Sequence, residues 1–221
     1  SEGILKSDKV YDYANVLKVR LHSLINSDAA QYFDYPNMIS RENYIDNFTR
    51  TADGKKAQIV DININDVNDR LATSITKIIS KMIFERACFD TRRGCDPTHI
   101  IIEEAHRYVQ RDNDIELLGY NIFERITKEG RKYGVILGLI TQRPSELSET
   151  CISQCTNFII LRTLHPKDLS YIKEMVPNIS EEGTRQLKTL QPGNALAFGS
   201  AFKVPVEIKF DRPDPEPLSN N

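Results

Sequence analysis

Two adjacent carboxylates, Glu103 and Glu104, directly follow the apolar run Ile100–Ile102. A short β-branched run of this kind is typical of a buried parallel strand. Open α/β sheets bind ligands at the carboxyl ends of their strands, so acids at this position predict a ligand site. One carboxylate can hold Mg²⁺ through water, while its neighbour orients and deprotonates a water for phosphoryl transfer. Solvated acids that end a strand are the alternative interpretation.

A second polar strand tip is formed by Thr141-Gln142-Arg143-Pro144, which follows the apolar run 135–140. A side-chain amide at a neighbouring tip can hydrogen-bond a terminal phosphate or the attacking water, which would make Gln142 a sensor. An ordinary turn from strand to helix, with Pro144 at the start of the helix, would give the same sequence.

A basic turn, Glu129-Gly130-Arg131-Lys132-Tyr133-Gly134, precedes the second apolar run. An arginine projecting from such a turn suits a charge clamp on the nucleotide of a neighbouring subunit. A solvated basic turn is the alternative. His106, which follows the two glutamates, is interpreted as a structural or loop-orienting residue rather than as a catalytic base.

Composition places the chain among ordinary globular proteins. Its 221 residues, with 40% hydrophobic and 27% charged, suit one large domain or a core with an appendage. The net charge of −2 argues neither for nor against nucleic acid. No apolar run is long enough to span a membrane, and the first residues do not have the basic-then-apolar pattern of a signal peptide, so we expect a cytoplasmic protein without a membrane partner. The four cysteines form no CxxC pair and are expected to be reduced thiols rather than zinc ligands.

Strands and helices alternate along the middle of the chain. Hydrophobic periodicity predicts strands at 57–62, 98–104, 134–140, 157–162, 194–199 and 203–210, and helices at 66–89, 115–126, 145–153, 166–175 and 180–190. Gly130 is expected to cap the helix that contains Ile126. This alternation predicts an α/β fold with a mainly parallel sheet flanked by helices, whose polar strand tips face one crevice. Three parts are expected: a helical segment at 1–50, the core at 51–210 and a Pro-rich extended tail at 211–221.

The order of these motifs resembles the HerA–FtsK superfamily of P-loop ATPases, and most closely the HerA-like DNA translocases. The resemblance covers about residues 57–210. The matching residues are Ile100 to Arg107, Glu129 to Gly134 and Leu139 to Ser145, with further similarity at Leu190 to Ala195 and Gly199 to Ala201. It implies that the fold is the C-terminal part of a RecA-like P-loop NTPase core.

The resemblance also implies a role for each motif residue. Glu104 corresponds to the catalytic glutamate, Glu103 to the Mg²⁺-side Walker B acid and Gln142 to the γ-phosphate sensor. Arg131 corresponds to an arginine finger that acts on a neighbouring subunit, and Arg143 is a weaker candidate for nucleotide contact. The implied cofactors are ATP and Mg²⁺, and the implied partners are double-stranded DNA, further copies in a hexameric ring and a nuclease or other effector. End processing and antiviral defence are the processes expected.

The phosphate-binding loop of such enzymes, GxxxxGK[ST], does not occur in these residues. The only Gly-Lys pair is Gly54-Lys55, and it is followed by Lys56 rather than by a hydroxyl residue. We therefore expect Ser1 to lie after the nucleotide-cradling part of the protein and the chain alone to bind ATP poorly and to be inactive. A conjugation or secretion motor of the same superfamily and a non-catalytic ring scaffold are the alternatives.

Overall fold

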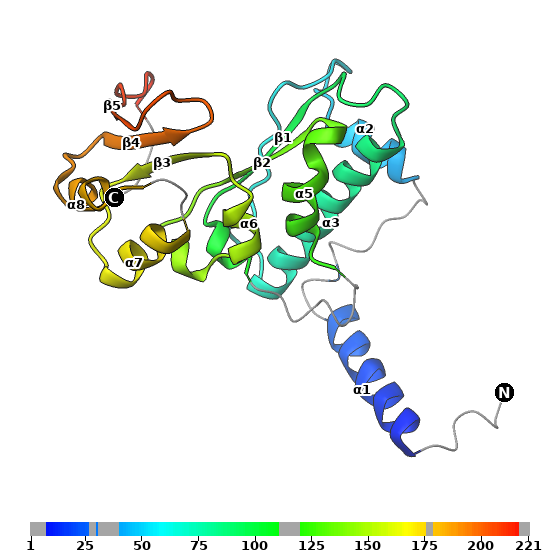
Figure 1. The fold of residues 1–221 in the computed structure, drawn as a ribbon. Helices are drawn as coiled ribbons and strands as arrows, with labels where there is room; N and C mark the ends of the chain where they lie inside the picture. The colour runs from blue at the N-terminus through cyan, green and yellow to red at the C-terminus, as the bar shows by residue number, and fades with distance from the viewer. Residues whose placement is uncertain (1–7, 27–29, 31–39, 111–119, 176–178, 217–221) are drawn as a thin grey trace. The chain divides into compact units, whose positions relative to one another are not determined.

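The computed structural model describes residues 8–26, 30, 40–110, 120–175 and 179–216 (Figure 1). The chain forms two compact units, residues 1–71 and residues 72–221. The first part of the helix predicted at 115–126 lies outside the described residues.

The first unit contains helices α1 (Asp8–Ile25) and α2 (Arg41–Phe48). Helix α2 begins after Ser40, whose hydroxyl accepts a hydrogen bond from the Asn43 amide at 3.2 Å, as expected of an N-cap. Beyond α2 an isolated antiparallel bridge joins Arg50 to Lys56 and closes a turn.

The strand predicted at 57–62 does not form. A strand requires a hydrogen-bonded neighbour, and among the described residues this segment has none beyond that of Ala57, whose amide donates to the Thr49 carbonyl at 2.8 Å. Ile59, in the middle of the segment, is 87% exposed. The apolar pattern is therefore present without the partner strand that it would need.

Helix α3 (Asp69–Phe89) begins after Asn68, whose side chain caps it by accepting the Arg70 amide at 3.0 Å. In the second unit its fully buried Phe84 ring meets the edge of the Tyr133 ring, with centroids 5.7 Å apart. The Arg125 guanidinium lies 5.3 Å from the centre of the same Phe84 ring. These contacts fix α3 against the segment that carries the basic turn.

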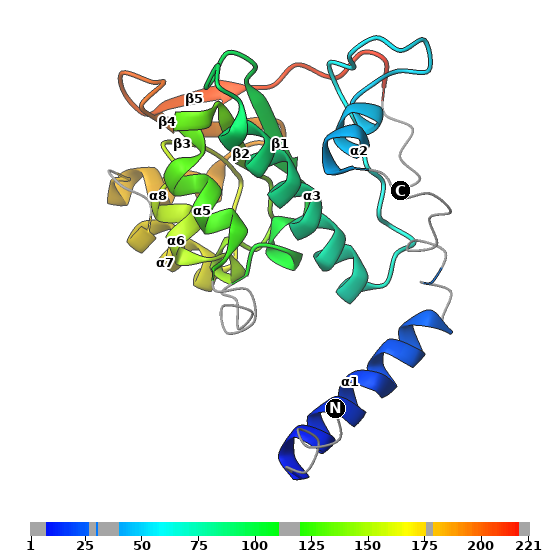
Figure 2. The same ribbon diagram turned by 90° about the vertical axis from the view of Figure 1, so that its right-hand side faces the viewer.

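The parallel pair of strands β1 (Thr98–Ile102) and β2 (Val135–Leu139) has Thr98 opposite Val135 and Ile102 opposite Leu139. Helix α5 (Ile122–Glu129) lies beside β2 (Figures 1 and 2), and its Phe123 and Ile126 side chains are buried. Strand β1 ends at Ile102, so Glu103 and Glu104 lie in a turn after the strand rather than inside it.

The second sheet is antiparallel, in the order β3 (Asn157–Leu161), β4 (Asn194–Gly199) and β5 (Val206–Lys209). Helices α7 (Pro166–Met175) and α8 (Glu181–Thr189) pack against it. Their shared core consists of Leu169, Ile172, Leu187, Leu190, Leu196 and Phe198.

The fold is α/β as predicted, but its strands are less parallel than predicted. Only β1 and β2 are parallel among the described strands. The short connection from β4 to β5 permits an antiparallel pair, whereas a parallel pair needs a long crossover. Strand β3 pairs with β4 and not with β1 or β2, so its tip does not share their edge.

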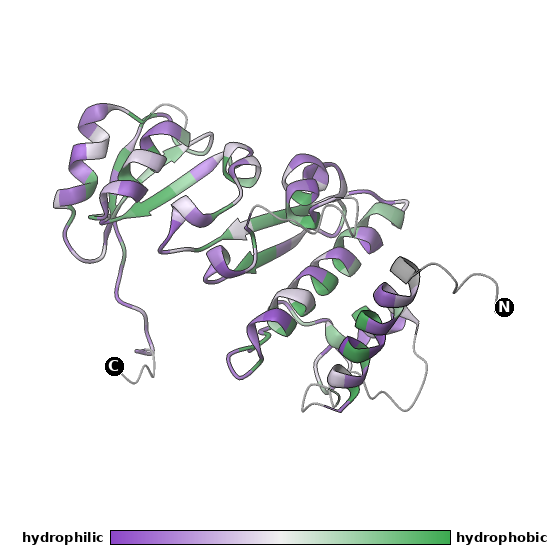
Figure 3. Ribbon diagram, turned by 90° about the horizontal axis from the view of Figure 1, so that it is seen from below, coloured by the Kyte–Doolittle hydropathy of each residue, from purple (hydrophilic) through white to green (hydrophobic). Residues whose placement is uncertain are grey.

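One face of the β1–β2 pair is apolar and open within the described part of the second unit. Ile101, Ile136 and Ile140 are 67%, 46% and 53% exposed, respectively. Figure 3 shows the hydrophobic residues concentrated in the strands, while the helices alternate hydrophobic and hydrophilic segments. Parallel strands are normally covered on both faces, so these isoleucines have the pattern of a covered strand without the cover.

The basic turn is a short 3₁₀ helix, η4 (Gly130–Tyr133), which continues directly from α5. Gly130 is the C-cap residue of α5, as predicted, but its backbone is right-handed at φ −53° rather than left-handed as in a typical glycine cap. The left-handed glycine of this turn is Gly134, at φ +75°, where an added Cβ would lie 2.9 Å from the Gly94 Cα. The loop before β1 and the turn before β2 therefore touch, backbone against backbone.

None of the described helices is both long and apolar enough to cross a membrane. All four cysteines are free thiols, and within the described residues no three acidic, His or Cys side chains gather as a metal site would require. Burial raises the pKa of the Cys151 thiol to about 11, which keeps it protonated and unreactive near neutral pH.

Replacing Gly134 with Ala should destabilise the second unit more than replacing Gly193 does. Both glycines have a positive φ, at +75° and +81°, so each Ala variant should lose about 1 kcal/mol from the left-handed backbone. Only at Gly134 would the new methyl group meet backbone, which should cost about 1–3 kcal/mol more. Urea unfolding of the two variants measures the difference. Equal losses would show that the Gly94–Gly134 contact does not constrain the turn.

Candidate functional site

The turn after β1 holds its second glutamate in an unusual backbone conformation. Glu104 has φ 46° and ψ 43°, and no other described residue except glycine has a positive φ. A left-handed residue with a Cβ costs roughly 1–2 kcal/mol. The turn persists because Ala105, fully buried, donates its amide to the Ile140 carbonyl at 2.9 Å, and Arg107 donates to the Glu104 carbonyl at 2.8 Å.

The Glu104 carboxylate meets side chains from both strand tips. Gln142 donates from Nε2 to Oε1 at 3.4 Å, and the His106 Nδ1 lies 3.3 Å from Oε2. The side chain of Glu104 is 45% exposed, so the carboxylate remains open to solvent. Glu103, its neighbour, is exposed and its carboxylate makes no hydrogen bond or ion pair with the described residues. The structure thus brings together three of the residues singled out by sequence, Glu103, Glu104 and Gln142.

A second contact between the tips joins His106 to Thr141. The imidazole Nδ1 lies 3.1 Å from the Thr141 hydroxyl, which also accepts the Arg143 amide at 3.0 Å. The His106 side chain is only 13% exposed. Thr141 was part of the predicted motif, but its hydroxyl was not given a role, because nothing in the sequence pairs it with a histidine 35 residues away.

Arg143 lies in the same strand tip as Thr141 and Gln142, but its side chain pairs with Glu146, three residues further along the chain. Its Nη1 lies 3.3 Å from Glu146 Oε1, and its side chain is 63% exposed. The short 3₁₀ helix η5 (Pro144–Glu146) follows, and the nearly buried Asp168 accepts the Ser145 amide at 3.2 Å. Sequence reasoning missed Asp168, because an acid in the first turn of a helix is ordinary. Here it fixes the segment that carries Gln142.

Arg131 lies at the other end of β2, before the strand rather than after it. At about 3.3 Å per residue, the five residues of β2 separate the two ends by about 15 Å. Arg131 is exposed, and its guanidinium makes no ion pair with the part of the chain that the structure describes. Within one chain, the structure therefore does not bring Arg131 to Glu104 or Gln142.

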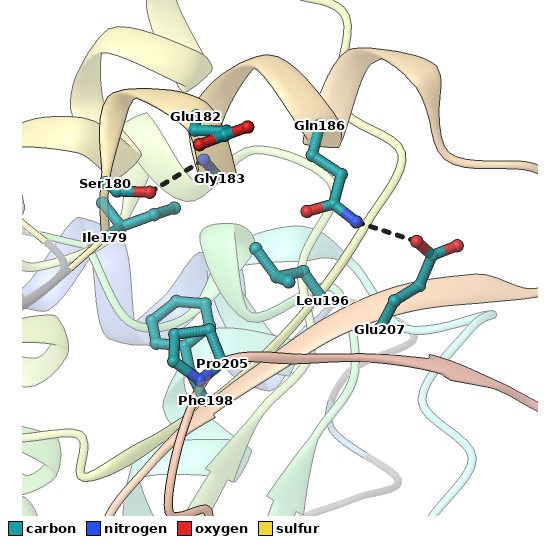
Figure 4. Close-up of a pocket in the computed structure, with 9 residues that line it drawn as sticks. All are labelled: Ile179, Ser180, Glu182, Gly183, Gln186, Leu196, Phe198, Pro205 and Glu207. Carbon is teal, nitrogen blue, oxygen red and sulfur yellow. Dashed lines mark hydrogen bonds between the residues drawn. The ribbon is translucent and has the colours of Figure 1, made fainter.

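The cavity shown in Figure 4 is a separate feature, with a volume of about 290 Å³. It lies between α8 and the β4–β5 hairpin and is lined by Ile179, Ser180, Glu182, Gly183, Gln186, Leu196, Phe198, Pro205 and Glu207. In it Gln186 donates to Glu207 at 2.8 Å. None of the predicted catalytic or nucleotide-binding residues lines this cavity, so the strand tips remain the candidate site.

The chemistry available at the tips is that of oxygen ligands and proton acceptance. A half-exposed carboxylate held by an amide and an imidazole can orient and deprotonate a water. The free carboxylate of Glu103 is a ligand of the kind that Mg²⁺ prefers. The fold and these strand tips define an α/β protein with a carboxylate-amide site at the carboxyl end of a parallel strand pair.

Comparisons with known proteins identify the family. The chain is 30% identical over 184 residues to a DNA double-strand break repair helicase HerA of Sulfurisphaera tokodaii, covering 77% of this chain and 37% of the relative. It is 29% identical over 214 residues to the HerA of Saccharolobus solfataricus, covering 90% of this chain and 42% of the relative. A probable helicase of Methanocaldococcus jannaschii is 44% identical over 118 residues, covering 53% of this chain and 22% of the relative. No protein-family model matches the chain.

Two solved structures share part of the fold. The genome packaging NTPase B204 of Sulfolobus turreted icosahedral virus 2 has a TM-score of 0.49 at 20% identity, over 60% of this chain and 61% of that chain. VirB4 of Thermoanaerobacter pseudethanolicus also has a TM-score of 0.49, at 19% identity, over 68% of this chain and 40% of that chain. These scores are low, and the family assignment depends on the sequence relatives. The chain is HerA-like in sequence, and it spans less than half the length of these relatives.

Replacing Glu104 with Gly should give a more stable protein than replacing it with Ala, by about 1 kcal/mol, because only glycine adopts this backbone without strain. Both variants lack the carboxylate, so the comparison isolates the backbone. Thermal or urea unfolding measures it. The same pair of variants at Glu103, which has no positive φ, should show the opposite order, with Gly less stable by about 0.5–1 kcal/mol. An identical order at both positions would contradict the strained turn.

Proposed function

We propose that the chain is part of a cytoplasmic ring ATPase that couples ATP hydrolysis to movement along double-stranded DNA. The observation that supports this most directly is the pairing of Glu104 with Gln142 across two strand tips, in a chain with HerA-like sequence. In this proposal residues 51–210 form the C-terminal part of the ATPase core, residues 1–50 form a helical segment and residues 211–221 form an extended tail.

Glu104 is the proposed base. Its carboxylate is open to solvent on one side and held by Gln142 on the other, so a water can reach it while its direction is fixed. Gln142, whose amide already reaches this carboxylate, is placed to contact both the attacking water and the terminal phosphate. Binding of the γ-phosphate to Gln142 would then affect the position of Glu104, the residue that activates water.

Glu103 is the proposed Mg²⁺-side ligand, through water. Its exposed carboxylate has no competing partner among the described residues, which fits a group that binds a hydrated cation. The metal supplies positive charge that offsets the charge of the phosphates. Arg143 is a weaker nucleotide contact, because it would have to leave Glu146, an exposed pair worth less than about 1 kcal/mol.

Arg131 is proposed to act on the nucleotide of a neighbouring copy. Its exposed guanidinium has no partner in the described residues, and Arg131 precedes β2 whereas Gln142 follows it, with the two ends of that strand about 15 Å apart. A residue so far from the site of its own chain can still reach the site of the next one. This supports a closed ring, proposed to be a hexamer, in which every site takes residues from two copies.

The partners and processes proposed for the whole protein are double-stranded DNA and a nuclease or other effector, in DNA end processing or antiviral defence. Names of the relatives support action on DNA: two are called DNA double-strand break repair helicases.

The decisive experiment measures ATP hydrolysis by the full-length protein with and without duplex DNA. The wild type should hydrolyse ATP faster with DNA, and native mass measurement should give a six-copy particle. Glu104→Gln should lower kcat by about 10²–10⁴-fold while ATP binding is retained, because only the proton acceptor is lost. Residues 1–221 alone should show no turnover. Equal rates in Glu104→Gln and wild type would refute the catalytic role, and a ring without any ATPase activity would favour the scaffold alternative.

Arg131→Ala should lower turnover by about 10³-fold without loss of assembly. The neighbouring Lys132→Ala, also on the exposed face of η4, is the matched control and should keep most activity. Mixing Arg131→Ala with Glu104→Gln subunits should restore activity, because some interfaces then combine an intact Glu104 with an intact Arg131. A mixture no more active than its components would exclude action between subunits.

A further inference from the structure

His106 contacts the Glu104 carboxylate and also reaches the second strand tip. Its Nδ1 lies 3.3 Å from Glu104 Oε2 and 3.1 Å from the Thr141 hydroxyl. The other carboxylate oxygen, Oε1, accepts a hydrogen bond from Gln142 at 3.4 Å. Each carboxylate oxygen of Glu104 therefore faces a different side-chain nitrogen. One nitrogen belongs to Gln142 in the tip that follows β2, and the other belongs to His106, which contacts Thr141 in the same tip.

The imidazole is fixed more firmly than the carboxylate that it faces. The His106 side chain is 13% exposed, against 45% for Glu104. The His106 carbonyl accepts the Gln110 side-chain amide at 2.7 Å, which fastens the residue from its backbone side. Glu104 has three side-chain torsions and is held by no other described group, so its direction depends on these two contacts.

The ring can stabilise Glu104 only when its Nδ1 carries a hydrogen. With its hydrogen on Nδ1, the ring donates toward the carboxylate, whereas with its hydrogen on Nε2 it would turn a lone pair toward a negative oxygen. The Thr141 hydroxyl already accepts the Arg143 amide and keeps a second lone pair free, so it can share the Nδ1 hydrogen. The Thr141 hydroxyl could also donate to Nδ1, but the Glu104 carboxylate can only accept, so its nearness favours a hydrogen on Nδ1.

We propose that His106 is a positioning residue, which holds the Glu104 carboxylate in the direction set by Thr141 and the β2 tip. The proposal rests on the function proposed above, in which Glu104 accepts the proton of the attacking water. His106 does not touch substrate and exchanges no proton with it. Its loss should leave ATP binding in place and leave the carboxylate free to rotate, so the chemical step slows.

The test uses steady-state ATP hydrolysis by the full-length protein carrying His106→Ala, His106→Asn or His106→Gln. An Asn side chain carries its amide nitrogen on Cγ, where histidine carries Nδ1, whereas Gln carries it one bond further out. His106→Ala and His106→Gln should lower kcat by about 10–100-fold with KM changed less than about threefold. His106→Asn should retain kcat within about threefold of wild type.

Two controls separate positioning from folding. Thermal unfolding should show all three variants folded at the assay temperature. His22→Ala removes an exposed histidine of α1, which is not part of the strand tips, and should leave kcat unchanged. His106→Ala in the Glu104→Gln background should cause no further loss, because the group that it positions is already absent.

Equal kcat in His106→Ala and wild type would overturn the positioning role while leaving the proposed function intact, provided that Glu104→Gln remains impaired. Equal loss in the Asn, Gln and Ala variants would also overturn it, because a donor at the Nδ1 position would then not suffice. Absence of Glu104-dependent hydrolysis in the wild type would instead overturn the proposed function itself.

Discussion

Two backbone hydrogen bonds beyond the ends of β1 and β2 join the strand tips. Ile140 donates to Ile102, and Ala105 donates to Ile140, each at 2.9 Å. They extend the parallel ladder past the last strand residues and bring the turn after β1 next to the turn after β2. Without this extension, Glu104 and Gln142, 38 residues apart in sequence, would have no fixed relation. Every side-chain contact in the candidate site depends on that short continuation of the sheet.

The same continuation explains why a strained residue is tolerated. Glu104 is forced into the left-handed region between Ile102, which is held in the ladder, and Ala105, which is fully buried. The cost of roughly 1–2 kcal/mol is of the size of one or two net hydrogen bonds, and the turn makes two. Strain of this kind is concentrated at functional sites, because it points a side chain where an ordinary strand residue could not point it.

Sequence patterns predicted the elements better than their pairing. The β-branched run before Glu103 and the helical pattern at 166–175 each act locally, and each was placed correctly. Strands pair between segments that lie far apart in the sequence. The hydrophobic pattern therefore could not show that β3 pairs with β4 or that the segment 57–62 has no partner strand in the described part of the chain.

The candidate site was predictable to the same extent. Glu103, Glu104 and Gln142 could be found because acids and amides at strand ends are informative by type and place. The left-handed turn at Glu104, the His106–Thr141 contact and the role of Asp168 could not, because each depends on which atoms meet in the folded chain. The roles of Glu103, Glu104, Gln142, Arg131 and Arg143 all remain predictions.

The open isoleucine face of the β1–β2 pair has a practical consequence for anyone who purifies this stretch by itself. Ile101, Ile136 and Ile140 lie on a strand pair whose outer edge, beside β1, has no neighbour among the described residues. An unpaired strand edge, with free backbone amides and carbonyls next to exposed hydrophobic side chains, is a template on which another molecule can add a strand. Protein with such an edge will aggregate more as its concentration rises. Mild detergent or added surface charge should slow this aggregation.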